Sequence, residues 1–227
     1  MGRKPLGVMP ADSGREVMAL LEVRYVNLNR RPDRRSQVEE ELRKVAAVSP
    51  VRFSAVDGAL SRGTEQSAND SASLGCALSH REVLRFAGTS AEAVMVCEDD
   101  LYFSGSRAEI WATIGDFLGD PRLDVLCLSY NIGDVPIRVH PRLLISQDIS
   151  TTACYIVKQH AVEILKESFD TSVQLFLAGE RVQVASIDQY WKRLQRRKLI
   201  FCIPDGRLAL QRESFSDITG AMEDRGV

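Results

Sequence analysis

Apolar and polar residues along this chain form blocks with two different periods. Short runs rich in Val, Leu, Ile and aromatic residues are typical of buried strands, and apolar residues three and four positions apart indicate helices that bury one face. The runs predict strands at residues 23–28, 51–56, 94–97, 124–130, 152–157 and 199–203. The helical spacing predicts helices at residues 32–48, 73–86, 108–118, 160–168 and 187–197. Because strands and helices alternate, we expect a single α/β domain with a mixed, mostly parallel sheet flanked by helices.

The segments between these elements are polar and rich in turn-forming residues. Residues 59–73 carry almost no large apolar side chain and predict a surface loop, and loops of that length are often functional. Residues 131–141 predict a turn-rich connection. We expect a mobile tail at residues 1–20, the domain at 21–218 and a second tail at 219–227.

Composition narrows the class of protein. The chain has 227 residues with 29 basic and 31 acidic side chains, so its net charge of −2 creates no global field that would attract nucleic acid. Its five cysteines show no C-x-x-C spacing and lie mostly in apolar segments, which is typical of reduced core residues in a cytosolic protein and not of disulfides or a zinc site. No apolar run approaches the roughly 20 residues that span a bilayer, so we expect a cytoplasmic protein without a transmembrane segment.

Three consecutive acids, Glu98, Asp99 and Asp100, directly follow the apolar run at residues 94–97. Carboxylates held this closely repel one another unless a cation neutralises them, and ligands of open α/β sheets bind at strand ends. Their oxygen atoms are hard ligands suited to Mn²⁺ or Mg²⁺, either of which could also bridge to a diphosphate. The alternative is a solvated acidic turn.

A second cluster of charge follows the first predicted strand, where four arginines lie within the six residues from Arg30 to Arg35. Pro32 is typical of the first position of a helix. Guanidinium groups and the free N–H groups of a helix N-terminus together form an anion site, which a diphosphate would fill. The alternative is a solvated basic turn.

Three single polar residues allow both a functional and a structural interpretation. Asp57 ends the second predicted strand and could accept hydrogen bonds from a base or a ribose, or form a turn with Gly58. His80 lies on a predicted helix of small residues, where a lone histidine is more often structural than a ligand. Asp188 begins a predicted helix and could be its N-cap or a general base.

Seven segments stand in a distinctive order: VRYVNLNRRPDRR, FSAVDG, LGCALSHREVLR, VMVCEDD, TTACYIVKQHAVEIL, SIDQYW and IPDGRLALQRESFSDI. In this order and spacing they resemble glycosyltransferase family 25, whose members include bacterial lipooligosaccharide galactosyltransferases and collagen galactosyltransferases. The resemblance covers residues 22–218, nearly the whole chain.

The resemblance implies a GT-A-type domain that transfers a hexose with inversion at the anomeric carbon. The implied donor is a nucleotide sugar, commonly UDP-galactose, with Mn²⁺ or Mg²⁺ as the cofactor. The implied acceptor is a hydroxyl group of a glycan, a glycolipid or another molecule. A glycolipid acceptor would place the protein in lipopolysaccharide biosynthesis, with peripheral contact to a membrane.

The resemblance also implies roles for particular residues. Its acidic metal motif matches Glu98, Asp99 and Asp100. Its donor-binding motifs match Asn27, Leu28, Asn29, Arg30, Asp57, Gly75, Ser79, His80, Gln211, Ser216, Asp217 and Ile218. Asn29 departs from the family, which commonly has Asp there, although an amide can still bind a ribose hydroxyl. The chain also ends nine residues after Ile218, so we expect it to lack a C-terminal region that could shape the acceptor site in relatives.

An inverting transfer needs a base on one side of the sugar and neutralisation of the departing diphosphate on the other. We expect Asp100, with either neighbouring acid, to hold the metal, and Arg30 with Arg34 or Arg35 to share that role. Asp188 is the predicted base, because it is an isolated carboxylate at a helix start.

Two other classes of protein fit parts of the pattern. The first is a catalytically impaired nucleotide-binding regulatory or scaffold protein of the same fold. The second is a metal-dependent phosphohydrolase, but its second metal cluster is missing because the three histidines stand apart from any paired carboxylate motif.

Overall fold

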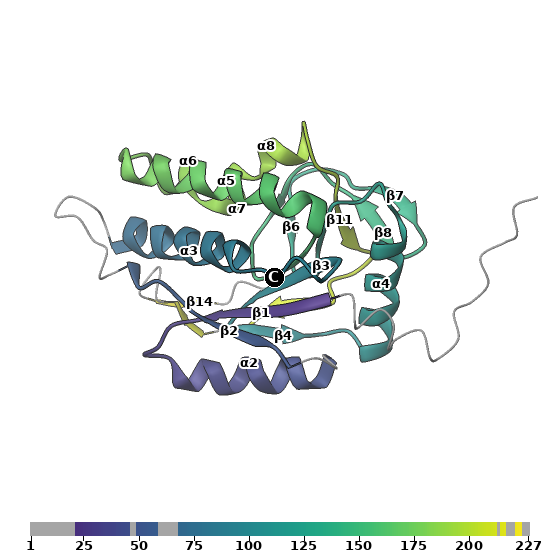
Figure 1. The fold of residues 1–227 in the computed structure, drawn as a ribbon, viewed down its shortest axis with the longest axis horizontal. Coiled ribbons are helices and arrows are strands. Elements are labelled where there is room, and N and C mark those ends of the chain that lie inside the picture. Colours follow the sequence, from purple (N-terminus) through teal and green to yellow (C-terminus); the bar gives the residue numbers. More distant parts are fainter. Residues whose placement is uncertain (1–20, 46–48, 59–67, 213, 217–220, 224–227) are drawn as a thin grey trace, which may run out of the picture.

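The computed structural model describes residues 21–45, 49–58, 68–212, 214–216 and 221–223. They form a mixed α/β fold in which helices cover both faces of a central sheet (Figure 1). The expected fold class is therefore confirmed. The predicted tail at residues 1–20 lies outside the described residues. No helix within these ranges is long and apolar enough to cross a membrane.

The central sheet has eight strands in the order β2-β1-β3-β10-β5-β11-β8-β7. Six of them run in one direction, and β10 and β8 run in the other. In sheet order they span Val51–Ser54, Leu21–Asn27, Ala93–Glu98, Cys154–Lys158, Val125–Cys127, Phe201–Pro204, Leu143–Ile145 and Ile137–His140. Because β1, β2 and β3 are parallel neighbours, their carboxyl ends meet at one edge of the sheet.

Three short antiparallel pairs complete the strands of the described residues. They are β4 (Leu101–Phe103) with β12 (Ala209–Gln211), β6 (Asn131–Ile132) with β9 (Ile149–Ser150), and β13 (Ser214–Ser216) with β14 (Ala221–Glu223). In the first pair, β4 directly follows Glu98, Asp99 and Asp100, and its pairing brings β12 to the same edge of the sheet.

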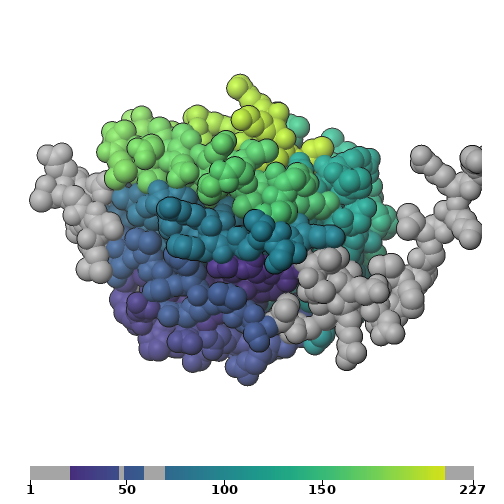
Figure 2. All heavy atoms as spheres, in the orientation of Figure 1, coloured from purple at the N-terminus to yellow at the C-terminus, as the bar shows by residue number. Residues whose placement is uncertain are grey.

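Each face of the sheet buries its own apolar core. One face is covered by α3 (Ala68–Arg85), α5 (Gln159–Leu177), α6 (Val182–Ala185), α7 (Ile187–Tyr190) and α8 (Lys192–Gln195). The other is covered by α2 (Pro32–Val45) and α4 (Arg107–Gly119). Figure 2 shows the green α5 segment lying closely against the blue α3 segment. Strand β3 contributes Val94 and Val96 to the first core and Met95 and Cys97 to the second, as alternation along a strand requires.

The predicted loop at residues 59–73 is wrong in its last part, because α3 already begins at Ala68. Residues 59–67 lie outside the described residues. The small side chains near the start of α3 serve close packing: Ser71 and Ser73 are buried, and a Cβ atom on Gly58 would lie 1.8 Å from the Ser71 carbonyl oxygen. Small polar residues favour a loop by sequence alone, but here Ser71 and Ser73 belong to the first turns of a helix and are buried.

The predicted helix at residues 160–168 is also too short, because α5 continues to Leu177. Phe169, Val173 and Phe176 extend its buried stripe. The polar residues between Phe169 and Val173 concealed this continuation. One of them, Ser172, is buried and donates a hydrogen bond to the Ala185 carbonyl oxygen, which attaches α6 to α5.

The second half of the chain differs most from expectation. The predicted helix at 187–197 is two short helices that meet at Trp191, whose buried Nε1 donates to the Ile149 carbonyl oxygen at 2.9 Å. The predicted strand at 124–130 is reduced to β5, and the predicted connection at 131–141 contains β6 and β7. These strands have two to four residues, too few for a periodic pattern to reveal.

Gly75 provides a test of how closely α3 packs. A Cβ atom there would lie 2.6 Å from the Gly58 backbone nitrogen and 2.8 Å from the Val56 carbonyl oxygen. We expect Gly75→Ala to lower the free energy of unfolding by about 1–3 kcal/mol, the range for overpacked interiors. The control is Gly115→Ala in α4, where no atom lies within 4 Å, and where better helix propensity should add about 0.5–1 kcal/mol. Urea unfolding measures the free energy of unfolding of both variants. Equal changes in the two would contradict the close packing of α3 at Gly75.

Candidate functional site

Two cavities lie at the sheet edge where β1, β2 and β3 end. The first, of about 430 Å³, we call the Asp188 cavity; its lining includes Cys76, Glu98, Thr151, Thr152, Asp188 and Gln211. The second, of about 440 Å³, we call the arginine cavity; it is lined by Arg31, Asp33, Arg34, Gln37, Asp100, Tyr102 and Arg212. The linings touch, because Gln211 Nε2 donates to Asp100 Oδ1 at 3.4 Å.

The three consecutive acids point to three different surroundings. Asp99 is buried on the α2 side, where its carboxylate accepts hydrogen bonds from Asn27 Nδ2 at 2.7 Å and from Arg34 Nη1 at 3.1 Å. Burial raises the pKa of Asp99, and the charge of Arg34 and these two hydrogen bonds oppose that rise. Asp99 therefore holds Arg34 at the wall of the arginine cavity.

Asp100 lies between the two cavities. Its Oδ2 is 3.7 Å from Arg34 Nη1, and its Oδ1 accepts the hydrogen bond from Gln211. Burial and the negative charges of Glu98 and Asp99 raise the pKa of Asp100 to about 7, although Arg34 and Gln211 act in the opposite direction. This carboxylate is held where negative charge accumulates, and a cation bound beside it would relieve that repulsion.

Glu98 faces the opposite side of the sheet, toward α3. Its carboxylate accepts a hydrogen bond from Thr152 Oγ1 at 2.7 Å and lies 3.5 Å from His80 Nε2. Glu98 ends β3 on the α3 side, whereas Asp99 lies in the following turn and binds Arg34 of α2, so the two carboxylates are directed apart. The prediction that Asp100 holds a metal ion together with Glu98 or Asp99 stays a prediction.

The arginines after β1 divide between two places. Arg31 and Arg34 line the arginine cavity, where Arg31 pairs with Asp33 at 2.9 Å. Arg30 instead pairs with Asp57, and Arg35 pairs with Glu39 on the exposed side of α2. The structure thus brings the acidic segment and part of the arginine segment together.

Several other predicted donor-binding residues stabilise the chain around the site. Asn29 Oδ1 accepts hydrogen bonds from Arg52 Nη2 at 2.8 Å and Ser54 Oγ at 2.9 Å. The Leu28 carbonyl oxygen accepts from the Arg31 backbone N–H at 2.9 Å and forms the turn into α2.

Buried Ser79 links α3 to the segment after β2. Its hydroxyl donates to the Gly75 carbonyl oxygen at 2.6 Å and accepts from the Val56 backbone N–H at 2.9 Å. Asp217 and Ile218 lie outside the described residues, and for Ser216 only the backbone, in β13, is described.

Asp188 lies in the first turn of α7, but the N-cap residue of that helix is Ser186, so the N-cap interpretation of Asp188 is wrong. Asp188 Oδ2 accepts hydrogen bonds from the Thr151 backbone N–H and from Gln189 Nε2, both at 3.3 Å. Thr151 has a φ of +76°, which is rare for a β-branched residue, and its hydroxyl donates to Gln211 Oε1 at 3.4 Å. Thr151 and Gln211 therefore connect Asp188 to Asp100.

Sequence reasoning missed Thr151, Arg212 and Cys76 as members of the site. Arg212 pairs with Glu41 and lies over the Tyr102 ring, with 5.6 Å from its guanidinium carbon to the ring centroid. It directly follows Gln211 in a segment that carries the resemblance, which was the available signal. No sequence pattern reports the backbone conformation of Thr151.

No protein-family model and no curated protein matches this chain. Similar solved structures include a glycosyltransferase involved in glycosylation of the major capsid of PBCV-1 (13% identity, TM-score 0.39), for which the match covers 68% of this chain and 65% of that one. They also include mouse xyloside xylosyltransferase 1 (8%, 0.40, covering 83% and 78%) and the inositol-1-phosphate CTP transferase of T. maritima (13%, 0.45, covering 90% and 77%). At these identities and TM-scores the similarity assigns no function.

The raised pKa of Asp100 predicts how stability depends on pH. The folded protein keeps this proton up to about pH 7, whereas the unfolded chain releases it near its ordinary value of 3.8. The free energy of unfolding should therefore fall as the pH rises between these values.

Asp100→Asn removes this dependence. In thermal melts at pH 8 with chelator present, we expect the Tm of the variant to exceed that of the parent. The difference should be at least about 2–4 °C, which is the Tm shift that 1 kcal/mol produces in a chain of this size. The difference should shrink below pH 4. Asp170→Asn, half-exposed on α5, is the control and should follow the parent. If the Tm of Asp100→Asn and that of the parent changed with pH in parallel, the raised pKa of Asp100 would be wrong.

Proposed function

We propose that this protein is a glycosyltransferase that uses a nucleotide-sugar donor, with the diphosphate in the arginine cavity and the acceptor in the Asp188 cavity. The observation that supports it most is that three arginines and Asp100 line one cavity, while a separate carboxylate, Asp188, lines the adjoining one. A displacement reaction needs this division, because the leaving diphosphate and the attacking hydroxyl lie on opposite sides of the sugar.

The charges in the arginine cavity suit a diphosphate. Arg34 is fixed by its buried pair with Asp99. Arg31 is held at the cavity wall by Asp33, whose two carboxylate oxygens accept hydrogen bonds from Arg31 Nε at 3.1 Å and Nη2 at 2.9 Å. Guanidinium groups bind phosphate oxygens in bidentate geometry.

A hard divalent cation fits at Asp100. Mg²⁺ and Mn²⁺ take oxygen ligands and are commonly held by one or two carboxylates together with phosphate oxygens. Asp100 offers such a carboxylate beside the negative charges of Glu98 and Asp99. When bound, the cation would neutralise charge on the diphosphate as it leaves. Asp99 would keep Arg34 in position, and Asn29 and Asp57, at the ends of β1 and β2, are our proposed contacts for the nucleoside.

Asp188 is the proposed general base. The Thr151 N–H and the Gln189 amide hold its Oδ2, so the orientation of its carboxylate is set before the acceptor binds. The carboxylate would take the proton of the acceptor hydroxyl as that oxygen attacks the anomeric carbon. A single displacement of this kind inverts the anomeric configuration. The resemblance to family 25 supports UDP-galactose as the donor and a glycan or glycolipid as the acceptor, used at the cytoplasmic side of a membrane.

One observation favours binding without transfer as a second candidate. Asn29 stands where the family commonly has Asp, and its amide oxygen is already bound by Arg52 and Ser54. An assay without acceptor distinguishes the two candidates. A transferase should hydrolyse the nucleotide sugar slowly and release the nucleotide, whereas a protein that only binds should release none.

Removal of the Asp100 carboxylate should abolish cation-dependent nucleotide binding. With Mn²⁺ and UDP at about 100 times Kd, binding should stabilise the parent protein by about 2.7 kcal/mol, visible as a higher Tm. We expect Asp100→Ala to lose this shift, and the parent with chelator to lose it also. Asp170→Ala is the matched control and should retain it. If UDP raised the Tm of the parent equally with and without chelator, the metal assignment would be wrong and the arginines alone would hold the phosphates.

Loss of the Asp188 charge should slow transfer and leave donor binding nearly unchanged. We expect Asp188→Asn to reduce kcat by roughly 10²–10⁴-fold, the usual contribution of a general base. Steady-state transfer assays and UDP titrations measure the two quantities, with Asp170→Asn as the control. A proportional loss of UDP affinity would instead indicate a structural role for Asp188.

A further inference from the structure

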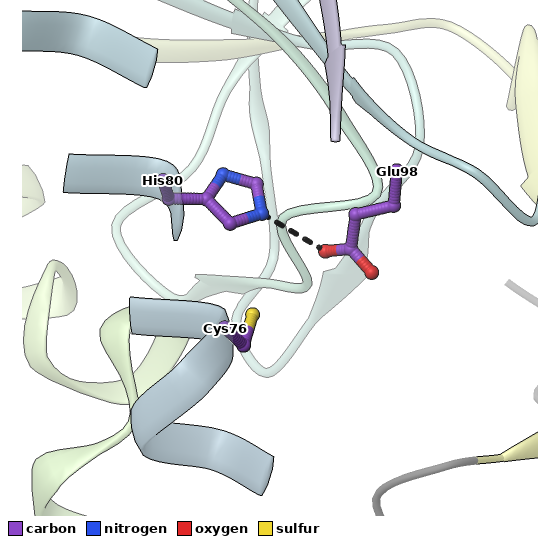
Figure 3. Close-up of side chains that lie close together, drawn as sticks. All are labelled: Cys76, His80 and Glu98. Atoms are coloured by element: carbon purple, nitrogen blue, oxygen red, sulfur yellow. Dashed lines mark ion pairs between the residues drawn. The ribbon is translucent and has the colours of Figure 1, made fainter. Parts of the chain in front are cut away.

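Cys76, His80 and Glu98 converge at the edge of the Asp188 cavity. Cys76 and His80 are four residues apart on α3, so they lie on one face of that helix in adjacent turns. Glu98 meets them from the end of β3, as Figure 3 shows. Their candidate ligand atoms all lie within 4.8 Å of one another, and no other group of this kind occurs among the described residues.

The imidazole of His80 is directed into this cluster and is completely buried. Within the described part of the chain its Nε2 has no hydrogen-bond partner and lies 3.5 Å from Glu98 Oε1. An unsatisfied buried polar atom is costly and calls for an explanation. A ligand bound at Nε2 would provide one.

The surroundings of His80 fix its orientation. Its Nδ1 lies 3.2 Å from the Tyr155 hydroxyl, and its ring packs against those of Tyr155 and Phe169 at centroid distances of 5.8 and 6.3 Å. If Nδ1 carries the proton and donates to the Tyr155 oxygen, the Nε2 lone pair faces Glu98 and Cys76. Metal-binding histidines commonly use their second nitrogen in this way.

We propose that Cys76 Sγ, His80 Nε2 and the Glu98 carboxylate bind a Zn²⁺-like transition-metal ion, with its fourth position open to the Asp188 cavity. Sulfur, nitrogen and oxygen donors together suit Zn²⁺, and three protein ligands with an open position are typical of its reactive sites. Thr152 donates to Glu98 and completes the outer shell. Cys76 binds as the thiolate, and its proton leaves to solvent.

This site is distinct from the hard-cation position proposed at Asp100. Cys76 and Glu98 line the Asp188 cavity, whereas Asp100 and Arg34 line the arginine cavity. The ligand types differ as well, because Mg²⁺ and Mn²⁺ favour oxygen and have little affinity for thiolate. The inference therefore does not rest on the proposed transfer reaction.

Co²⁺ provides the test, because it replaces Zn²⁺ and reports its ligands by absorption. Titration of the full chain with Co²⁺ should produce the near-ultraviolet thiolate-to-cobalt band and the intense visible bands of a four-coordinate ion, at one equivalent. Zn²⁺ should displace them. Cys76→Ala should remove the thiolate band, and His80→Gln should weaken Zn²⁺ binding by more than the roughly 10–100-fold that loss of an outer-shell partner costs.

The matched control is Cys202→Ala, whose cysteine lies in the core on the opposite face of the sheet and should keep every band. Asp100→Ala should also keep them, which separates this site from the proposed donor site. Circular dichroism confirms that each variant is folded. A cobalt complex without the thiolate band, or one unchanged in Cys76→Ala, would overturn the metal site, whatever the outcome of the UDP experiments.

Discussion

The buried ion pair between Arg34 and Asp99 is the contact on which the arrangement of the site depends. It joins the first turn of α2 to the turn after β3, and Asn27 at the end of β1 donates to the same carboxylate. Both side chains of the pair are only 10% exposed. Loss of one partner of such a pair costs about 3–5 kcal/mol, because the other charge is left buried without compensation. The pair therefore holds the arginine cavity in one shape.

The turn after β3, which contains Asp99, also directs neighbouring carboxylates to different surroundings. Glu98 is the last residue of β3 and faces α3, Asp99 faces α2, and Asp100 directly precedes β4 and accepts a hydrogen bond from Gln211 of β12. The three adjacent carboxylates therefore lie in three different surroundings. Glu98 has sulfur and nitrogen neighbours, Asp99 is neutralised by an arginine, and Asp100 is held between the two cavities. This division would allow the two cation sites that we propose, one with sulfur and nitrogen ligands and one at Asp100, to lie close together with different ligands.

Backbone strain is concentrated where the two cavities meet. Thr151 adopts a left-handed conformation that costs of order 1–3 kcal/mol for a residue with a branched side chain. Its N–H and hydroxyl bind Asp188 and Gln211, and these contacts hold the unfavourable conformation in place. The strain directs one backbone donor at the proposed base, and an ordinary strand conformation would direct it elsewhere.

Local patterns determined the elements whose signal lies within a few residues. The apolar run before Glu98 predicted β3, Pro32 with the spacing of Val38 and Leu42 predicted α2, and the acidic and basic clusters indicated where charge would gather. The tertiary structure decided the rest. The first turns of α3 pack closely against Gly58 through Ser71, which the sequence did not reveal. Arg212 reaches the arginine cavity because β12 pairs with β4, and Cys76 meets Glu98 only when α3 lies on the sheet. Periodicity reports which face of an element is buried, whereas these contacts join residues far apart in the chain, and their geometry exists only once both cores have packed.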